Sequence, residues 1–324
     1  SCASIADGRY ISGGSSSGSA VAVARGLMAF ALGSDTGGSG RIPAGFNEVV
    51  GIKPTVGLVS SRGLVPNFPT IDCVSIFCNT VRDGEAVLGV IEGFDPEDPY
   101  SRRAPASSGS GPAREFRFGR LAAADLECFG MTECAELYEA ACARFSRLGG
   151  RAVAIDFAPF REAGEMMFTG PWVAERRSAI AALTDIDQGG LLDVTKTVLE
   201  SAVGYSAMDA FAAIHRLYRL RRTTQEMFSE LDAFVVPTAP RPFTLGDMHS
   251  DPVTLNNRLG YSSYFANLLD LCAVAIPNAK VPSGMPMGVT LLAPAWRDRE
   301  LIRLARRLEP DGEDAAFELK SRAR

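Results

Sequence analysis

Lysine and histidine are scarce in this sequence. Only four of its 33 basic residues are lysine, at positions 53, 196, 280 and 320, and there are only two histidines, His215 and His249. No lysine precedes Lys53, so the Gly/Ser-rich stretch near the N-terminus does not end in the Gly-Lys-Ser/Thr of a phosphate-binding P-loop. The net charge is −5 and no basic block occurs. These absences exclude a P-loop and predict no nucleic-acid partner.

Long apolar runs and paired cysteines are also missing. No apolar run approaches the ~18 residues of a membrane span, so no membrane partner is expected. The seven cysteines form no C-x-x-C pair and their number is odd. This pattern favours reduced thiols in the cytoplasm over a disulfide framework or a zinc site. The hydrophobic content of 46% and the charged content of 22% are typical of a globular protein with a sizeable core.

The most informative stretch runs through residues 11–41, ISGGSSSGSAVAVARGLMAFALGSDTGGSGR. Two Gly/Ser-rich loops, at residues 13–19 and 36–40, bracket an almost wholly apolar segment at 20–32. By composition the first loop alone is typical of a flexible linker. However, it leads directly into apolar sequence, and a second Gly/Ser loop follows closely. We interpret the pair as a rigid site whose glycines free amide N–H groups and whose serines offer nucleophiles.

A histidine-dependent site is an alternative that the residues leave open. Residues 14–18 match the G-x-S-x-G elbow of α/β-hydrolases, which requires a downstream acid and a histidine. His215 lies in FAAIHRLYRLRR, which is typical of a helix face. His249 lies in a polar loop between Asp247 and Asp251, so a triad through His249 is conceivable. Chemistry without histidine fits the two loops better.

Several motifs resemble the amidase signature family of Ser-Ser-Lys amide hydrolases. They are GGSSSGSA, GSDTGGSGRIPA, VGIKPTVGLVS, LDAFVVPTAP, AVAIPNAKV and MGVTLLAP, in this order. Ser15 and Ser39 are 24 residues apart, as the two catalytic serines of that family are. The resemblance extends from about Arg9 to about Arg307. Within the family it is strongest to allophanate hydrolases, through RYISGGSSSGSAVAVA, DCVSIFC, FDPEDPYSR and GPWVAER.

The resemblance implies a role for each residue of the two loops. Ser39 would attack the carbonyl carbon, and Ser15, held by a cis peptide bond, would relay the proton. Ser16 would support the relay, while Asp35 and Arg41 would brace the second loop with an ion pair. The oxyanion hole would consist of four backbone N–H groups, those of Thr36, Gly37, Gly38 and Ser39. Amide and urea carbonyls are poor electrophiles, so their hydrolysis needs both the nucleophile and this stabilisation.

The resemblance also implies the substrate and the partners. Arg176, in GPWVAER, would bind the substrate carboxylate, and Phe168 stands where the family has a tyrosine that contacts substrate. Allophanate or a related small amide is the expected substrate, with no metal and no organic cofactor. A homodimer and functional coupling to a urea carboxylase are further expectations. Two rivals remain: the amide-cleaving component of a tRNA-dependent amidotransferase, and a non-catalytic scaffold that retains the fold.

The general-base lysine of the family lies well upstream of the first loop. This chain begins with Ser1 and has fourteen residues before Ser15, none of which is lysine. Lys53, in GIKPT, matches a different family position and is interpreted as structural. We therefore expect that an N-terminal part with the lysine is missing from these 324 residues, and that the chain alone is inactive.

The order of the expected elements predicts an α/β fold. Strands at 116–121 and 151–155 around a helix at 132–148 indicate a parallel β-α-β unit. Further strands are expected at 28–33, 49–53, 57–60, 233–236, 273–276 and 288–292. Helices are expected at 19–30, 39–46, 82–93, 159–168, 173–183, 192–202, 207–231 and 298–308. The Pro/Ser/Gly-dense residues 95–113 form a loop and the internal seam of one amidase domain spanning residues 1–324. The resemblance implies a mixed central sheet wrapped by helices.

Overall fold

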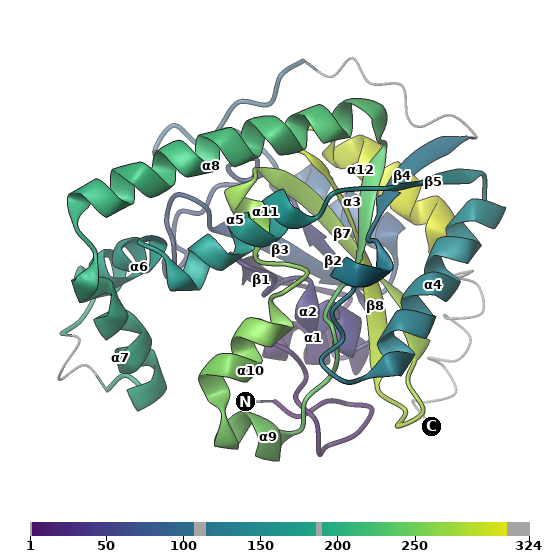
Figure 1. Ribbon diagram of the computed structural model, residues 1–324, viewed down its shortest axis with the longest axis horizontal. Coiled ribbons are helices and arrows are strands. Elements are labelled where there is room, and N and C mark those ends of the chain that lie inside the picture. The colour runs from purple at the N-terminus through teal and green to yellow at the C-terminus, as the bar shows by residue number, and fades with distance from the viewer. Residues whose placement is uncertain (1, 107–114, 186–189, 310–324) are drawn as a thin grey trace.

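A mixed β-sheet forms the centre of the molecule in the computed structural model, which describes residues 2–106, 115–185 and 190–309 (Figure 1). The strands of the described residues lie in the order β1-β3-β2-β7-β8-β6-β4-β5. Their bounds are β1 (Phe30–Asp35), β2 (Val50–Lys53), β3 (Cys73–Cys78), β4 (Phe116–Arg120), β5 (Gly150–Ala154), β6 (Ala233–Pro237), β7 (Leu271–Lys280) and β8 (Pro286–Pro294). The β4–β5 and β4–β6 pairs are parallel, and the other pairs of these strands are antiparallel. The predicted mixed sheet is confirmed.

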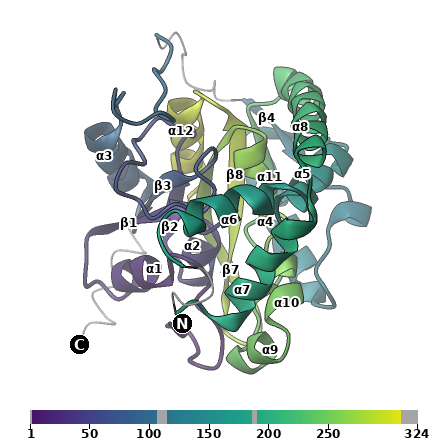
Figure 2. The ribbon, with the colours of Figure 1, turned by 90° about the vertical axis from the view of Figure 1, so that its left-hand side faces the viewer.

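Helices cover both faces of this sheet. Figure 2 shows α3 (Val81–Ile91) and α12 (Asp298–Leu308) on one side, and α5 (Ala158–Thr169), α8 (Ala207–Met227) and α11 (Phe265–Leu268) on the other. The remaining helices are α1 (Ser17–Ala24), α2 (Ile42–Phe46), α4 (Thr132–Arg147), α6 (Trp172–Ala181), α7 (Asp193–Glu200), α9 (Leu245–Ser250) and α10 (Pro252–Leu259). Among the described residues, no helix is long and apolar enough to cross a membrane.

The core forms where apolar runs of the sheet meet apolar helix faces. Strands β7 and β8 are buried over most of their length, as expected for strands with elements on both faces. In α12, Leu301, Leu304, Ala305 and Leu308 are buried at helical spacing and belong to the same apolar cluster as the strands. Burial of this surface, at about 25 cal/mol per Å², is the main favourable term in folding.

The helix ends follow local side-chain chemistry. Ser206 accepts the backbone N–H of Asp209, and the Asp209 carboxylate accepts the backbone N–H of Ser206, so a capping box starts α8. Thr244 and Asp247 make the same arrangement at the start of α9. Each box satisfies two backbone donors that a helix start would otherwise leave unpaired.

Most predicted elements are present, with three corrections. The helix expected at 19–30 is shorter, because α1 ends at Ala24 and β1 begins at Phe30. The predicted parallel β-α-β unit is confirmed by the register of β4 and β5. The strand predicted at 57–60 is wrong, because Gly57 has φ +80° and Leu58 closes a turn onto the carbonyl of Thr55. Strand β7 does not end before Pro277. It continues to Lys280 through an irregularity between Pro277 and Ala279, where a proline is tolerated.

The predicted seam at 95–113 lies only partly within the described residues, since 107–113 fall outside them. Strands from both sides of it join one sheet: β2 precedes the seam and pairs with β7, which follows it. The loop therefore connects two parts of a single sheet.

Candidate active site

A cavity of about 800 Å³ lies where the two Gly/Ser loops meet. Ser15 of the first loop and Ser39 of the second both line it. Arg176 and Phe168, which were predicted to join the site from a distant segment, line it as well. The structure thus brings together residues from three separate stretches of the chain.

The first loop is held by hydrogen bonds of its own serines. The peptide bond between Gly14 and Ser15 is cis, as the resemblance implied. The Ser16 hydroxyl donates to the carbonyl oxygen of Ser34 at 3.0 Å and accepts the Ser34 backbone N–H at 3.1 Å. The Ser17 hydroxyl donates to the Gly13 carbonyl at 2.6 Å. Ser16 therefore ties the loop to β1 with both its donor and its acceptor.

Close approach of the two loops depends on Gly13. Its φ is +78°, a region that favours glycine, and a Cβ there would lie 2.8 Å from the Cα of Pro43. Pro43 belongs to α2, which begins directly after the second loop. Any larger residue at position 13 would push the loop of Ser15 away from the loop of Ser39.

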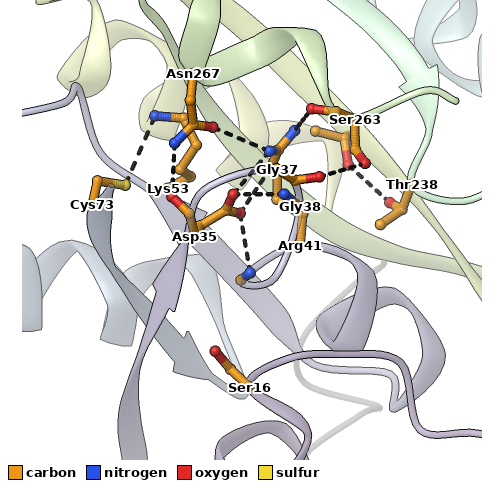
Figure 3. Close-up of polar contacts among 12 residues, drawn as sticks. Ser16, Asp35, Gly37, Gly38, Arg41, Lys53, Cys73, Thr238, Ser263 and Asn267 are labelled. Carbon is orange, nitrogen blue, oxygen red and sulfur yellow. Dashed lines mark hydrogen bonds and ion pairs between the residues drawn. The ribbon is translucent and has the colours of Figure 1, made fainter. Parts of the chain in front are cut away.

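The second loop is built around a buried ion pair, shown in Figure 3. Arg41 binds both carboxylate oxygens of Asp35, each at 2.9 Å, and both side chains are fully buried. The same carboxylate accepts the backbone N–H groups of Gly38 at 2.8 Å and Gly40 at 3.1 Å. Burial raises the pKa of the Asp35 carboxyl, but attraction to Arg41 and these hydrogen bonds outweigh it, so the pKa lies below its ordinary value. Asp35 thus remains ionised and fixes the loop's curvature.

These contacts change the predicted oxyanion hole in the second loop, residues 36–40, which we call the oxyanion loop. The Gly38 N–H donates to Asp35, so it is not available to a ligand, contrary to the expectation. Within the described residues, the backbone N–H groups of Thr36, Gly37 and Ser39 donate to no protein acceptor, and all three residues line the cavity. Three of the four predicted donors are therefore free of such partners.

Two residues that were not predicted from the sequence hold the oxyanion loop from the far end of the chain. Asn267 donates to the carbonyl of Asp35 at 2.7 Å, and the Ser263 hydroxyl donates to the carbonyl of Gly37 at 2.9 Å (Figure 3). The Ser263 carbonyl in turn accepts from Arg41 at 3.0 Å. The local signal was weak: Asn267 lies in the mostly apolar run YFANLLDLCAVAI, which Ser263 directly precedes.

Asp72 is a third residue that was not predicted. Its carboxylate accepts the hydroxyl of Thr36 in a short contact, and also the backbone N–H groups of Asn67 at 2.7 Å and Phe68 at 2.9 Å. Asp72 is itself buried. It therefore fixes the side chain of an oxyanion-loop residue against the wall of the cavity.

Arg176 is a basic group of the cavity without an acidic partner in the described part of the chain. Its Nε is buried with no hydrogen bond, and no acid among the described residues forms an ion pair with it. Burial lowers the pKa of its guanidinium, which still remains charged at any physiological pH. Such a partly buried guanidinium is suited to bind a carboxylate with two parallel hydrogen bonds.

Phe168 forms part of the apolar wall next to this arginine. Its ring lies 5.8 Å from Phe68, edge-on, and 4.8 Å from Tyr264. The Tyr264 hydroxyl donates to the Asn256 carbonyl at 2.8 Å and accepts from the Asn256 side chain at 3.0 Å. That phenol is therefore engaged and does not replace the one absent at position 168.

The histidine alternative gains little from the geometry. His249 lines the cavity from α9, but its side chain has no hydrogen bond to Ser15 or Ser39 within the described residues. The acids on either side are used elsewhere, Asp247 in the capping box of α9 and Asp251 in the cap of α10. Neither is placed to orient the imidazole as a triad requires.

Lys53 is likewise engaged away from the cavity. It is fully buried and donates to the Pro54 carbonyl at 2.7 Å, with the Cys73 sulfur at 3.9 Å (Figure 3). This environment agrees with the structural role expected for it. Lys280 pairs with Glu48 on another part of the surface.

The arrangement has several of the parts needed for acyl transfer. Within the described residues, neither the Ser15 nor the Ser39 hydroxyl has a protein hydrogen-bond partner, and both line one cavity. N–H groups of the oxyanion loop lie beside Ser39, where they could stabilise an oxyanion. A guanidinium in the same cavity could hold an anionic group of the substrate.

Known proteins are similar to this chain over almost its whole length. The family model described as Amidase matches residues 6–302. Urea amidolyase of Saccharomyces cerevisiae is 36% identical over 303 residues, covering 92% of this chain and 16% of that protein. The A component of glutamyl-tRNA(Gln) amidotransferase from a Synechococcus strain is 32% identical over 332 residues, covering 92% of this chain and 67% of that protein.

A solved structure agrees with the fold. The allophanate hydrolase of Kluyveromyces lactis has a TM-score of 0.90 and 34% identity, covering 94% of this chain and 50% of that chain. The present chain thus spans half of that hydrolase and 16% of the yeast urea amidolyase.

Proposed function

This chain belongs to the amidase family, and we propose that it hydrolyses a small carboxylate-bearing amide, with allophanate as the substrate. The observation that carries the proposal is the shared cavity, in which two serine hydroxyls and an arginine occur together, none of them engaged by an acid among the described residues. The similarity to urea amidolyase and to an allophanate hydrolase supports the same substrate.

Ser39 acts as the nucleophile in this proposal. Its Oγ attacks the amide carbonyl carbon, and its proton passes to Ser15, whose hydroxyl can donate and accept at once. The tetrahedral intermediate then collapses, the C–N bond breaks, and ammonia leaves with a proton returned through Ser15. Water hydrolyses the remaining acyl-enzyme and releases Ser39.

The oxyanion loop stabilises the negative charge that forms during each attack. The backbone N–H groups of Thr36, Gly37 and Ser39 supply the donors, while the Gly38 N–H holds the loop in shape through Asp35. Each lost donor of this kind typically costs about 3–4 kcal/mol of transition-state stabilisation. The buried pair of Asp35 and Arg41 keeps the donors in place without reorganisation.

Arg176 selects the substrate by its carboxylate. No acid of the described residues competes for the guanidinium, so a substrate carboxylate can occupy two of its parallel donors. Phe168 offers only a ring beside it, so one polar contact to substrate is absent relative to a tyrosine.

In this proposal a lysine accepts the proton from Ser15, and it is none of the lysines that the structure describes. Lys53 and Lys280 are engaged elsewhere, and Lys196 does not line the cavity. Coupling of the reaction to a urea carboxylase, and assembly as a homodimer, are further parts of the proposal that follow from the family resemblance.

Ammonia release from allophanate by the protein as its gene encodes it tests the proposal. We expect turnover in the wild type and only background with Ser39→Ala, at an unchanged melting temperature, because the substitution removes only a hydroxyl that lines the cavity. Retained turnover in Ser39→Ala would reject Ser39 as the nucleophile. A wild type inactive on allophanate but active on glutamine would favour the amidotransferase function, which the relative at 32% identity keeps open. Inactivity on every amide would favour a scaffold.

A further inference from the structure

Residues 65–72 connect the two halves of the proposed substrate site. Val65, Pro66 and Asn67 line the cavity, and Phe68 packs edge-on against Phe168. We name residues 65–72 the cavity strap. Its two anchors are made by acidic side chains, one near each end of the proposed substrate.

The first anchor is Asp72, which binds the oxyanion loop. Its Oδ1 accepts the Thr36 hydroxyl, and its Oδ2 accepts the N–H groups of Asn67 and Phe68. The Asn67 side chain adds a contact of 3.4 Å to the Thr36 hydroxyl. One end of the strap is thereby fixed to the loop that carries Ser39.

The second anchor is Glu175, which binds the strap to α6. Its Oε1 accepts the Thr70 backbone N–H at 2.7 Å and its Oε2 accepts the Thr70 hydroxyl at 2.9 Å. Glu175 directly precedes Arg176 on this helix. An acid next to an arginine would ordinarily be a candidate partner for it, but both oxygens of this carboxylate are taken by Thr70.

We infer that Glu175 is a positioning residue that sets the place of Arg176 relative to the oxyanion loop and so selects substrates by their carboxylate. The inference rests on the proposed function, because it assigns to Arg176 the binding of a substrate anion. Its physical basis is the chain of contacts from α6 through Thr70, the strap and Asp72 to the oxyanion loop. Removing the Glu175 carboxylate releases α6 from the strap and lets the guanidinium move, and a misplacement of about 1 Å is enough to weaken a bidentate contact greatly.

A purely structural role for Glu175 makes a different prediction. Glu175 lies in the first turn of α6, where a negative charge stabilises the helix by its dipole alone. In that case its loss would lower the melting temperature and would affect charged and neutral ligands alike. Discrimination between ligands separates the two roles.

Binding to the inactive Ser39→Ala protein provides the test, with the protein otherwise as its gene encodes it. Calorimetry compares malonamate, an amide with a carboxylate, with malonamide, its neutral counterpart. We expect the Ser39→Ala protein, the parent of the other variants, to bind malonamate more tightly than malonamide. Adding Glu175→Ala to this parent should reduce that preference about tenfold, with little change in the affinity for malonamide. Thr70→Val removes one of the two anchoring hydrogen bonds and should reduce the preference for malonamate by less. Thr70→Ser keeps the hydroxyl and should leave that preference unchanged.

Glu162→Ala is the matched control. Glu162 is a glutamate on the preceding helix α5 that pairs with Arg216 at the surface and does not contact the strap. It should leave the preference unchanged. A second control combines Glu175→Ala with Arg176→Ala, where the loss of Glu175 should have no additional effect on malonamate.

The outcomes distinguish the inference from the proposed function. If the parent prefers malonamate and Glu175→Ala keeps that preference, the positioning role is overturned while the carboxylate selection stands. If Glu175→Ala weakens both ligands equally, the residue is only structural. If the parent shows no preference at all, the role of Arg176 in the proposed function fails, and the inference fails with it.

Discussion

Position 168 shows how a single side chain shapes recognition in this cavity. Phe168 and Tyr264 lie ring against ring, yet the tyrosine hydroxyl is bound to Asn256, and Phe168 brings no polar group of its own to the cavity. Binding of the substrate carboxylate would therefore depend on Arg176. A hydrogen bond to a charged group contributes about 1.5–3 kcal/mol, so one more donor to this carboxylate would raise kcat/KM measurably.

We predict that Phe168→Tyr raises kcat/KM for allophanate by about tenfold, because it adds a phenol donor beside the carboxylate site. The neutral amide biuret should respond far less. Steady-state ammonia release on both substrates measures this. A decrease for allophanate would mean that the phenol finds no partner and that the ring is needed for packing against Phe68.

At the scale of elements, the oxyanion loop is rigid because hydrogen bonds and an ion pair connect it to a strand, a helix and a distant segment. Asp35 ends β1, Arg41 precedes α2, and Ser263 and Asn267 lie at α11. A buried ion pair of this kind is costly to break, since removing one partner leaves an uncompensated charge in the interior.

Asp35→Asn should therefore destabilise the fold by about 3–5 kcal/mol, because Arg41 stays buried without its anion. The folded pKa of Asp35 is lowered, so its contribution to stability is fully present above the unfolded value of about 3.9 and is lost as the pH falls through the folded pKa. The difference in melting temperature between wild type and Asp35→Asn should thus stay constant from pH 8 to about 5 and shrink only in stronger acid.

Asp7→Asn, which removes a surface pair with Arg9, is the control and should hardly change the melting temperature. A difference that already shrinks between pH 7 and 6 would contradict a lowered pKa.

Gly38 is a position of the oxyanion loop where glycine is required. Its φ is +120°, and a Cβ there would lie 2.6 Å from the Ser263 hydroxyl. Gly38→Ala should cost about 1–3 kcal/mol of stability and abolish most turnover, because the loop must shift away from Ser263. Gly18→Ala, in α1 with no atom within 4 Å of the added methyl group, should leave both unchanged. Thermal unfolding measures the stability of Gly38→Ala and Gly18→Ala, and ammonia release measures their turnover. Equal stability and turnover of the two variants would refute the strain at Gly38.

The elements that the sequence predicted well are those with long periodic patterns. The helices α4, α8 and α12 and strand β4 have apolar positions that repeat at the spacing of their structure. The strand expected at 57–60 failed because Gly57 turns the chain, and α9 to α11 were missed because they are short. The two serines and Arg176 could be placed in one site only through the family resemblance. Asp72, Ser263 and Asn267 could not be found, because Thr36, Gly37 and Asp35, the site residues that they contact, lie far away in the sequence. Hydrogen bonds at such separations leave no periodic signal.

At the scale of the whole molecule, one sheet joins the two loops to the segment of Ser263 and Asn267 that holds the oxyanion loop. The first loop precedes β1, the second follows it, and Ser263 and Asn267 precede β7. Strand β7 pairs with β2, which follows α2, so segments from early and late in the chain meet behind the loops. The geometry of the two loops therefore depends on strands from both early and late in the chain.

We predict that the 324-residue chain by itself releases ammonia from allophanate only at background. Among its described lysines, Lys53 and Lys280 are engaged away from Ser15, and Lys196 does not line the cavity. Robust activity of the 324-residue chain would mean that its own residues supply the base. His249, which lines the cavity, would then be the first candidate, and His249→Gln would identify it.

One cavity holds Ser39, the proposed nucleophile, and Arg176, which we propose recognises a carboxylate. The decisive experiment compares steady-state ammonia release by wild type and Arg176→Ala on allophanate and on biuret. We expect Arg176→Ala to raise KM for allophanate at least about tenfold and to change biuret turnover little, since biuret has no carboxylate. An equal loss on both substrates would show that Arg176 is structural and would refute its role in carboxylate recognition.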